Sequence, residues 1–161
     1  MNVRPATTED VPSVLPMVVK ECAFHETLDP AKYGFRPHPE ERYHRWLLTR
    51  ADDPRSVFLV ADAAGAGELP RLGGFLIATV EKEIPIYRLE EFGFIHDVWV
   101  DETYRHEGVA RQLTTLAIER FRAIGVKQIR LDVLARNDPA RGLFAACGFR
   151  PSVTEMLMEL P

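Results

Sequence analysis

The segment of residues 92–134 constrains the fold more than any other part of the chain. Its apolar run FGFIHDVWV predicts a strand, and the amphipathic helix that starts near Gly108 ends at Gly125. The alternating segment KQIRLDVL, with Ile129, Leu131 and Val133 expected to point inward, predicts a second strand. A strand, a helix and a strand joined in this order form parallel neighbours through a right-handed crossover. The fold must therefore contain a parallel strand pair.

Strands and helices are predicted on both sides of this unit. Apolar residues recur at helical spacing over residues 7–26 and 40–50, and a short strand precedes them at the N-terminus. Residues 56–63 and 71–82 predict two strands joined by the small-residue turn 64–70. Residues 137–147 predict a capped helix and 151–160 a last strand. The order β-α-α-β-β-β-α-β-α-β indicates an α+β fold with a mixed, mostly antiparallel central sheet flanked by helices, in one domain over residues 1–161.

Composition limits the class of protein. The chain is 46% hydrophobic and 27% charged, which is typical of a soluble globular protein, and its net charge of −4 argues against a nucleic-acid partner. The N-terminus carries no apolar signal segment and no run is long enough to span a bilayer, so we expect no membrane association. Cys22 and Cys147 lack metal or redox spacing, which favours a cytoplasmic location. His25, His38 and His44 are scattered, so no metal site is expected.

The turn YRHEGVA, which joins the first of these strands to the helix, is a candidate phosphate site. The first amides of a helix have no partner inside it, and the dipole makes that end favourable for an anion. Gly108 permits a close approach, Ala110 keeps the first turn thin, and Arg105 and Arg111 add positive charge. No G-K-[ST] follows, which excludes a Walker loop. Taken alone, the same residues are more typical of an ordinary structural turn.

A second motif one strand downstream favours the phosphate site. The segment NDPARGLFAACGF carries Asn137, Ala140, Leu143, Gly148 and Phe149. Together with Arg105, Gly108 and Ala110, and with Glu102 where proline is common, these positions resemble the GCN5-related N-acetyltransferase (GNAT) superfamily. The resemblance implies that acetyl-CoA is the co-substrate. It implies a cofactor site made of Val98, Trp99, Val100, Arg105, His106, Glu107, Gly108, Val109, Ala110, Arg111, Asn137 and Phe144.

Phe144 is where the chain departs from the family. It stands at the position of the usual tyrosine, which lies near the thiolate leaving group and is often assigned as the general acid. A phenyl ring cannot donate a proton. The role is therefore vacant or filled from elsewhere, by Tyr87 in the irregular segment PIYRLEE or by water.

The candidate general base lies in the stretch IHDVWV. His96 takes the position of a strand glutamate that serves as base in some acetyltransferases, and a histidine titrates near neutrality. A half-buried structural histidine is the alternative. Strand alternation predicts that the neighbouring Asp97 points to the opposite face, so that only one of the two lines the cleft. His96 is the preferred candidate, and Asp97 is the next one.

These observations predict an enzyme that moves an acetyl group from acetyl-CoA to a primary amine by direct attack in a ternary complex. The acceptor is a small molecule or a peptide. The alternatives are a non-catalytic acyl-CoA-binding or regulatory module, which Phe144 leaves open, and a transferase of a longer acyl group. The apolar last strand, together with the family's tendency to form dimers, favours a homodimer.

Overall fold

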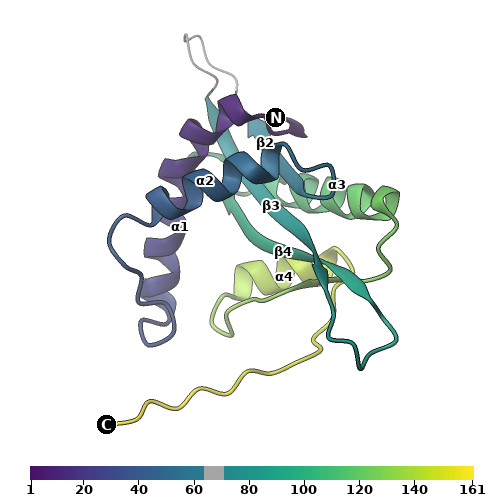
Figure 1. Ribbon diagram of the computed structural model, residues 1–161. Helices are drawn as coiled ribbons and strands as arrows, with labels where there is room; N and C mark the ends of the chain where they lie inside the picture. Colours follow the sequence, from purple (N-terminus) through teal and green to yellow (C-terminus); the bar gives the residue numbers. More distant parts are fainter. Residues whose placement is uncertain (64–70) are drawn as a thin grey trace.

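A computed structural model describes residues 1–63 and 71–161 (Figure 1). Its elements are β1 (Asn2–Pro5), a 3-10 turn η1 (Thr8–Asp10), α1 (Val11–Leu28), α2 (Pro39–Ala51), β2 (Val57–Asp62), β3 (Leu72–Lys82), β4 (Glu91–Val100), a 3-10 turn η2 (Glu102–Tyr104), α3 (Val109–Ile124), β5 (Ile129–Leu131) and α4 (Asp138–Ala146). The order agrees with the predicted one as far as α4. The turn predicted over residues 64–70 lies outside the described residues.

The five strands form one sheet in the order β1-β2-β3-β4-β5. The first four pair antiparallel, and β4 pairs parallel with β5 across the α3 crossover. The α+β fold with a mixed, mostly antiparallel sheet is therefore confirmed. β5 covers only Ile129–Leu131, less than the predicted strand 127–134, and Val133 beyond it is 37% exposed rather than inward.

Helices cover both faces of the sheet and create two cores (Figure 1). On one face α1 and α2 bury Val14, Val18 and Leu47 against Phe75 and Ile77. On the other face α3 buries Leu113, Ala117 and Phe121 against residues of β2, β3 and β4. The helical periodicity of the sequence identified these faces correctly because each helix has one apolar stripe.

A β-bulge interrupts the pairing of β3 with β4. Ile77 lies opposite Asp97 and Ala78 lies opposite Ile95, so His96 is an extra residue in β4. One extra residue reverses the alternation that follows it. Both His96 and Asp97 therefore face α2, where the His96 ring contacts Trp46 and the Asp97 carboxylate is bonded by a tyrosine. The prediction that Asp97 points to the opposite face from His96 is wrong for this reason.

The two parallel strands diverge directly after the point where they pair. The last paired residues are Ile95 of β4 and Leu131 of β5. β4 continues through Val98 and Val100, while the chain leaves β5 toward α4. The divergence explains the short β5, because residues 132–134 have no strand beside them. It also leaves the end of β4 open on its β5 side.

The C-terminal segment corrects a second prediction. The residues predicted as a last strand, 151–160, form no strand and run as an extended segment below the helices and the sheet in Figure 1, where Glu155 pairs with Lys32. Their apolar side chains are exposed, including Val153 at 89% and Met156 at 88%. A period of two residues defines the faces of a strand, but a strand also needs a partner to pair with. No described strand of the chain pairs with this segment.

Candidate active site

The turn before α3 has the geometry of an anion site. His106 and Gly108 both have positive φ, 67° and 80°, and such residues turn successive backbone N–H groups toward one concavity. The first helical bond runs from the Gln112 N–H to the Gly108 carbonyl, and no side chain caps the preceding amides. A Cβ added at Gly108 would have no atom within 4 Å. The space next to these amides is therefore open to a ligand.

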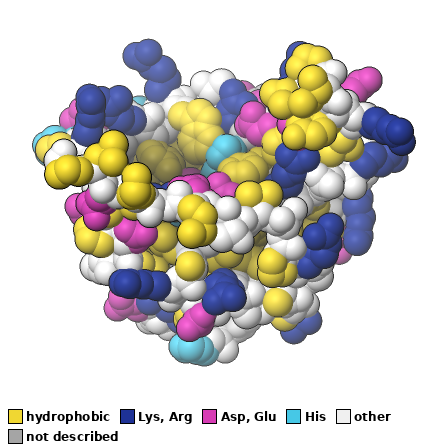
Figure 2. All heavy atoms as spheres, turned by 90° about the horizontal axis from the view of Figure 1, so that it is seen from below, with side chains coloured by type: hydrophobic (Ala, Val, Ile, Leu, Met, Phe, Trp, Pro, Cys, Tyr) yellow, Lys and Arg dark blue, Asp and Glu magenta, His cyan; other side chains and the backbone are white. Residues whose placement is uncertain are grey.

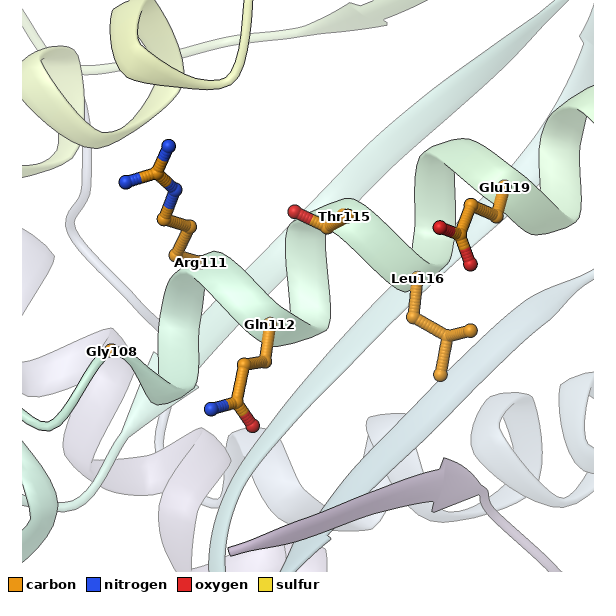
Figure 3. A pocket seen from close by; sticks show the side chains of 6 residues that line it. All are labelled: Gly108, Arg111, Gln112, Thr115, Leu116 and Glu119. Carbon is orange, nitrogen blue, oxygen red and sulfur yellow. The ribbon is translucent and has the colours of Figure 1, made fainter.

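The two arginines of the turn have different positions. The Arg105 side chain is directed back, with Nε donating to the Val100 carbonyl at 3.1 Å and the guanidinium 4.8 Å from the Trp99 ring centroid. Arg111 extends from the first turn of α3 toward α4 (Figure 3). It lines an open groove on α3 together with Gly108, Gln112, Thr115, Leu116 and Glu119. Only Arg111 is free to bring its charge to a bound anion there.

Asn137 begins α4 as its N-cap. Its Oδ1 accepts a hydrogen bond from the Ala140 N–H at 3.2 Å, which satisfies one of the free amides of the helix. The side-chain NH₂ group has no such role in the cap. The residue can therefore hold the helix with its oxygen and donate to a ligand with its nitrogen.

Substitutions at Asn137 separate these two roles. We expect Asn137→Ala to lower the free energy of unfolding by about 1 kcal/mol, because the cap is lost. Asn137→Asp keeps the acceptor oxygen and should leave the stability within about 0.5 kcal/mol, while both variants weaken acetyl-CoA binding. Chemical denaturation and calorimetric titration with acetyl-CoA measure the two effects. Full affinity in Asn137→Asp would restrict this residue to capping.

The candidates for the general acid lie apart. Phe144 is buried in the inner face of α4, with its ring 5.7 Å from that of Phe149. Tyr87 lies in the turn between β3 and β4 and is 57% exposed. Among the described residues, no hydrogen bond or ring contact joins Tyr87 to His96 or Asp97.

His96 belongs to a polar network on the α2 side of the sheet. Its Nε2 lies 2.6 Å from the Thr79 hydroxyl, which donates its proton to the Glu81 carboxylate at 2.5 Å. A hydroxyl has one proton, so we assign the His96 ring proton to Nε2, donated to Thr79. This tautomer leaves Nδ1 with a lone pair.

The surroundings of His96 favour its neutral form. The rings of Trp46 and Phe94 contact it edge-on at 5.2 and 5.0 Å. Burial lowers the pKa of His96, and the nearby Glu81 carboxylate only partly offsets the shift. The side chain is still 28% exposed. A neutral imidazole with a free lone pair on a partly exposed side chain has the properties of a general base.

Asp97 lies deeper than His96, next to a second acidic residue. The Tyr43 hydroxyl donates to Asp97 Oδ1 at 3.3 Å, whereas Oδ2 is buried without a partner. Glu21 of α1 is 6% exposed. Burial raises the pKa of Asp97, and burial together with the Asp97 charge raises that of Glu21 well above its usual range.

Sequence reasoning missed the partners of both candidate bases. Glu21, Tyr43, Thr79 and Glu81 come from α1, α2 and β3. One signal was present for Glu21, because it interrupts the apolar helical stripe that includes Val14 and Val18. On the same side of the sheet, Phe24 of α1 packs on Trp99 with ring centroids 6.0 Å apart.

The lower side of the molecule in Figure 1 is hollowed. Figure 2 shows hydrophobic side chains along this hollow, with acidic side chains and a histidine near its centre. Within residues 1–63 and 71–161, no three His, Cys, Asp or Glu side chains form a group that could hold a metal ion. No helix of the same residues has the length and apolar character needed to cross a membrane.

Comparison with known proteins agrees with this geometry. The model of the acetyltransferase (GNAT) family matches residues 22–149. Mycothiol acetyltransferase of Corynebacterium aurimucosum is 31% identical over 124 residues, which are 72% of this chain and 39% of that protein. The uncharacterized N-acetyltransferase YycN of Bacillus subtilis is 31% identical over 87 residues, 54% of this chain and 53% of that protein. The chain thus matches only about half or less of the length of these curated relatives.

Solved structures share the whole fold. A mutant of the BH1408 protein from Bacillus halodurans superposes with a TM-score of 0.81 at 22% identity and covers 100% of both chains. An aminoglycoside 6'-N-acetyltransferase from Acinetobacter haemolyticus superposes with a TM-score of 0.71 at 15% identity, covering 100% of this chain and 99% of that one. At these identities the likeness concerns the fold alone. The family model, which matches most of the chain and both of its motifs, shows that this protein belongs to the GNAT family of acetyltransferases.

Proposed function

We propose that this protein transfers the acetyl group of acetyl-CoA to a primary amine, by direct attack in a ternary complex. The observation that carries the proposal is the bulge at His96. The bulge puts a neutral imidazole on the α2 side of the sheet, next to the point where β4 and β5 diverge. The free amides at the start of α3 follow after the end of the same strand. Base, thioester site and phosphate site would then follow one another along β4 and its turn.

The co-substrate would lie along the open end of β4. The free backbone groups of Val98–Val100 would bond the pantetheine amides, and the turn from Arg105 to Arg111 would take the pyrophosphate. The NH₂ group of Asn137 would donate to the pantetheine arm. This route is supported by the divergence after Ile95 and by the positive φ of Gly108.

The proposed reaction requires a proton acceptor at the amine. His96 Nδ1 accepts a proton from the ammonium group, and the free amine then attacks the acetyl carbonyl carbon. The new C–N bond replaces the C–S bond, whose electron pair remains on the sulfur of coenzyme A. His96 passes the first proton on to water, and the second amine proton, lost after attack, goes to water or to the imidazole that is neutral again. Neither cysteine is suited to act as a nucleophile, because burial raises the pKa of Cys22 to about 11 and that of Cys147 above its usual value and so disfavours the reactive thiolate.

The missing phenol at Phe144 can be tested by restoring it. We expect Phe144→Tyr to raise kcat by at least about tenfold, because it restores a phenol that can protonate the leaving group. Thiol release at saturating acetyl-CoA and amine measures kcat. An unchanged kcat with intact folding would mean that water or Tyr87 already supplies the proton.

A panel of amines tests the activity itself. Thiol release from acetyl-CoA is measured with small amines, aminoglycosides, amino acids and peptides, and mass spectrometry identifies the acetylated product. Stoichiometric thiol and acetyl-amine from at least one acceptor support the proposal. Binding of acetyl-CoA without transfer to any member would favour the acyl-CoA-binding module that Phe144 suggests, and faster transfer from a longer acyl-CoA would favour the second alternative.

We also propose a homodimer. The exposed apolar side chains of residues 151–160 form a large uncovered surface for so short a segment. Static light scattering at micromolar concentration should give twice the chain mass of 18.3 kDa, and a monomer would contradict the proposal.

A further inference from the structure

The carbonyl group of Val100 lies on the open side of β4. The Asp101 N–H donates to the Gly73 carbonyl of β3 at 2.9 Å, so the backbone groups of Asp101 point toward β3. Successive residues of an extended chain direct their N–H and C=O groups to opposite sides, so those of Val100 point away from β3. On that side β5 pairs with β4 only as far as Ile95, and none of the described strands reaches the Val100 carbonyl.

The side chain of Arg105 occupies this place. Its Nε donates to the Val100 carbonyl at 3.1 Å, and its guanidinium group lies over the ring of Trp99, 4.8 Å from the centroid. A third contact is weaker, because the Glu102 carboxylate is 3.8 Å from Nη1 and its side chain is 83% exposed. Arg105 therefore covers the end of β4 with one hydrogen bond and one cation–π contact.

This position conflicts with the proposed path of pantetheine. A pantetheine amide that donates to the Val100 carbonyl approaches it from the open side of β4, where the Nε–H and the guanidinium group of Arg105 already lie. The arm and the side chain cannot both hold this space. The Arg105 side chain is 36% exposed and belongs to neither core, so it can move without unpacking a core. A bound pantetheine arm must therefore displace it.

The displaced guanidinium group gains a new partner only from a donor that carries a pyrophosphate. Arg105 begins the turn that leads through Gly108 to the free amides of α3, where the proposed function places the pyrophosphate. Guanidinium and phosphate groups form bidentate, charge-assisted hydrogen bonds, which are stronger than a bond to a neutral carbonyl. Such bonds offset the loss of the Val100 and Trp99 contacts. A pantetheine thioester without phosphates provides no such compensation.

We infer that Arg105 is a specificity-determining residue for the acyl donor: its side chain covers the end of β4 against pantetheine thioesters that lack a pyrophosphate, and the pyrophosphate of coenzyme A draws it away. The inference rests on the proposed function and adds to it a choice between donors that share the same reactive thioester. Arg105 acts by exclusion as well as by attraction, which is how many sites separate similar ligands. It does not touch the reacting atoms.

Two donors and two variants of the same turn test this inference. Acetyl-CoA and S-acetylpantetheine are titrated onto each protein, and NMR titration gives the dissociation constants. Arg105→Ala should lower the dissociation constant of S-acetylpantetheine about three- to tenfold, because this donor no longer has to displace the side chain. The dissociation constant of acetyl-CoA should change by less than about threefold, because the variant loses a pyrophosphate partner together with the cover.

Arg111→Ala is the matched control. It removes a charge that extends toward α4 rather than over β4 (Figure 3). Acetyl-CoA should bind this variant more weakly, while S-acetylpantetheine should bind it as it binds the wild type. The melting temperature of each variant verifies folding. The wild-type preference for acetyl-CoA over S-acetylpantetheine should therefore shrink in both variants, but for opposite reasons.

The NMR signal of the Arg105 Nε–H gives a second readout in the wild type, which needs no stable variant. The proton is hydrogen-bonded and its group lies over an indole, so its signal should be shifted by the ring and slow to exchange with water. Saturating acetyl-CoA should remove this ring shift. Arg105→Ala or, if that variant does not fold, selective arginine labelling assigns the signal.

Three results would overturn the inference while acetyl transfer still occurs. Weaker binding of both donors to a folded Arg105→Ala would make Arg105 a structural residue. Weaker binding of acetyl-CoA alone would make it a pyrophosphate ligand like Arg111. A ring-shifted signal that persists in saturating acetyl-CoA would show that the Arg105 side chain stays on β4 in the complex. The proposed function fails in a different way, if acetyl-CoA does not bind or no amine is acetylated.

Discussion

Replacing His96 by alanine should lower kcat/KM for the acceptor amine by ~10²–10⁴-fold, the loss typical of removing a general base. In the wild type this rate should rise with pH through a transition below the usual pKa of histidine, because burial lowers the pKa of His96. The base is active when neutral, so a lowered pKa extends activity toward acid pH. In His96→Ala the rise of kcat/KM with pH should flatten, apart from the slope that the ionisation of the amine itself contributes.

Two further variants show whether the effect is specific to the imidazole. Thr79→Val removes the partner that holds the Nε2 proton and should cause a smaller loss, with the pH limb still present. His44→Ala removes an exposed histidine from α2 and should leave rate and profile unchanged. Initial rates of thiol release over pH 5 to 9 at limiting amine provide the comparison. If His96→Ala keeps both rate and profile, Asp97 or a water chain becomes the base.

Gly108→Val should abolish most of the stabilisation that acetyl-CoA gives the protein. Ligand at a hundred times its dissociation constant stabilises a fold by roughly 2.7 kcal/mol, which for a chain of this size raises the melting temperature by roughly 5 to 10 °C. A valine side chain at Gly108 would enter the open space beside the free amides and would also strain the backbone, since φ is 80°. Thermal unfolding with and without acetyl-CoA measures both consequences.

Gly125 provides the matched control, because it lies at the other end of the same helix. It has a φ of 95° and nothing within 4 Å of an added Cβ, so Gly125→Val carries a similar strain and no clash. Both variants should melt at a lower temperature than the wild type, and only Gly125→Val should retain the full acetyl-CoA shift. Equal shifts in the two variants would move the phosphate site away from this turn.

The sequence predicted the parts of the fold that depend on local patterns. The stripe of α3 and its two flanking glycines identify the crossover, and the crossover requires β4 and β5 to be parallel. The end of β5 could not be predicted in the same way, because it depends on where β4 turns aside. The same holds for residues 151–160, whose alternation describes a strand while the partner strand is a matter of tertiary structure.

The candidate site was predictable where one motif contains it, as at Gly108 and Asn137. It was not predictable where the bulge decides the geometry, because alternation counts residues and an extra residue in one strand is invisible until the pairing is known. The proximity of Glu21 and Asp97 depends on the packing of α1 against β4, which no local pattern encodes. The bulge also explains why Asp97, assigned to the opposite face, lies on the same face as His96.

The bulge has a consequence for how this family member can change over time. In the register of β3 with β4, His96 has no residue opposite it, so its side chain carries no part of either core. Replacements at this position should therefore cost little stability compared with replacements at Ile95, which is 3% exposed. Variation of the chemistry is then decoupled from variation of the scaffold, and a saturation library at position 96 should yield mostly folded proteins with widely different rates.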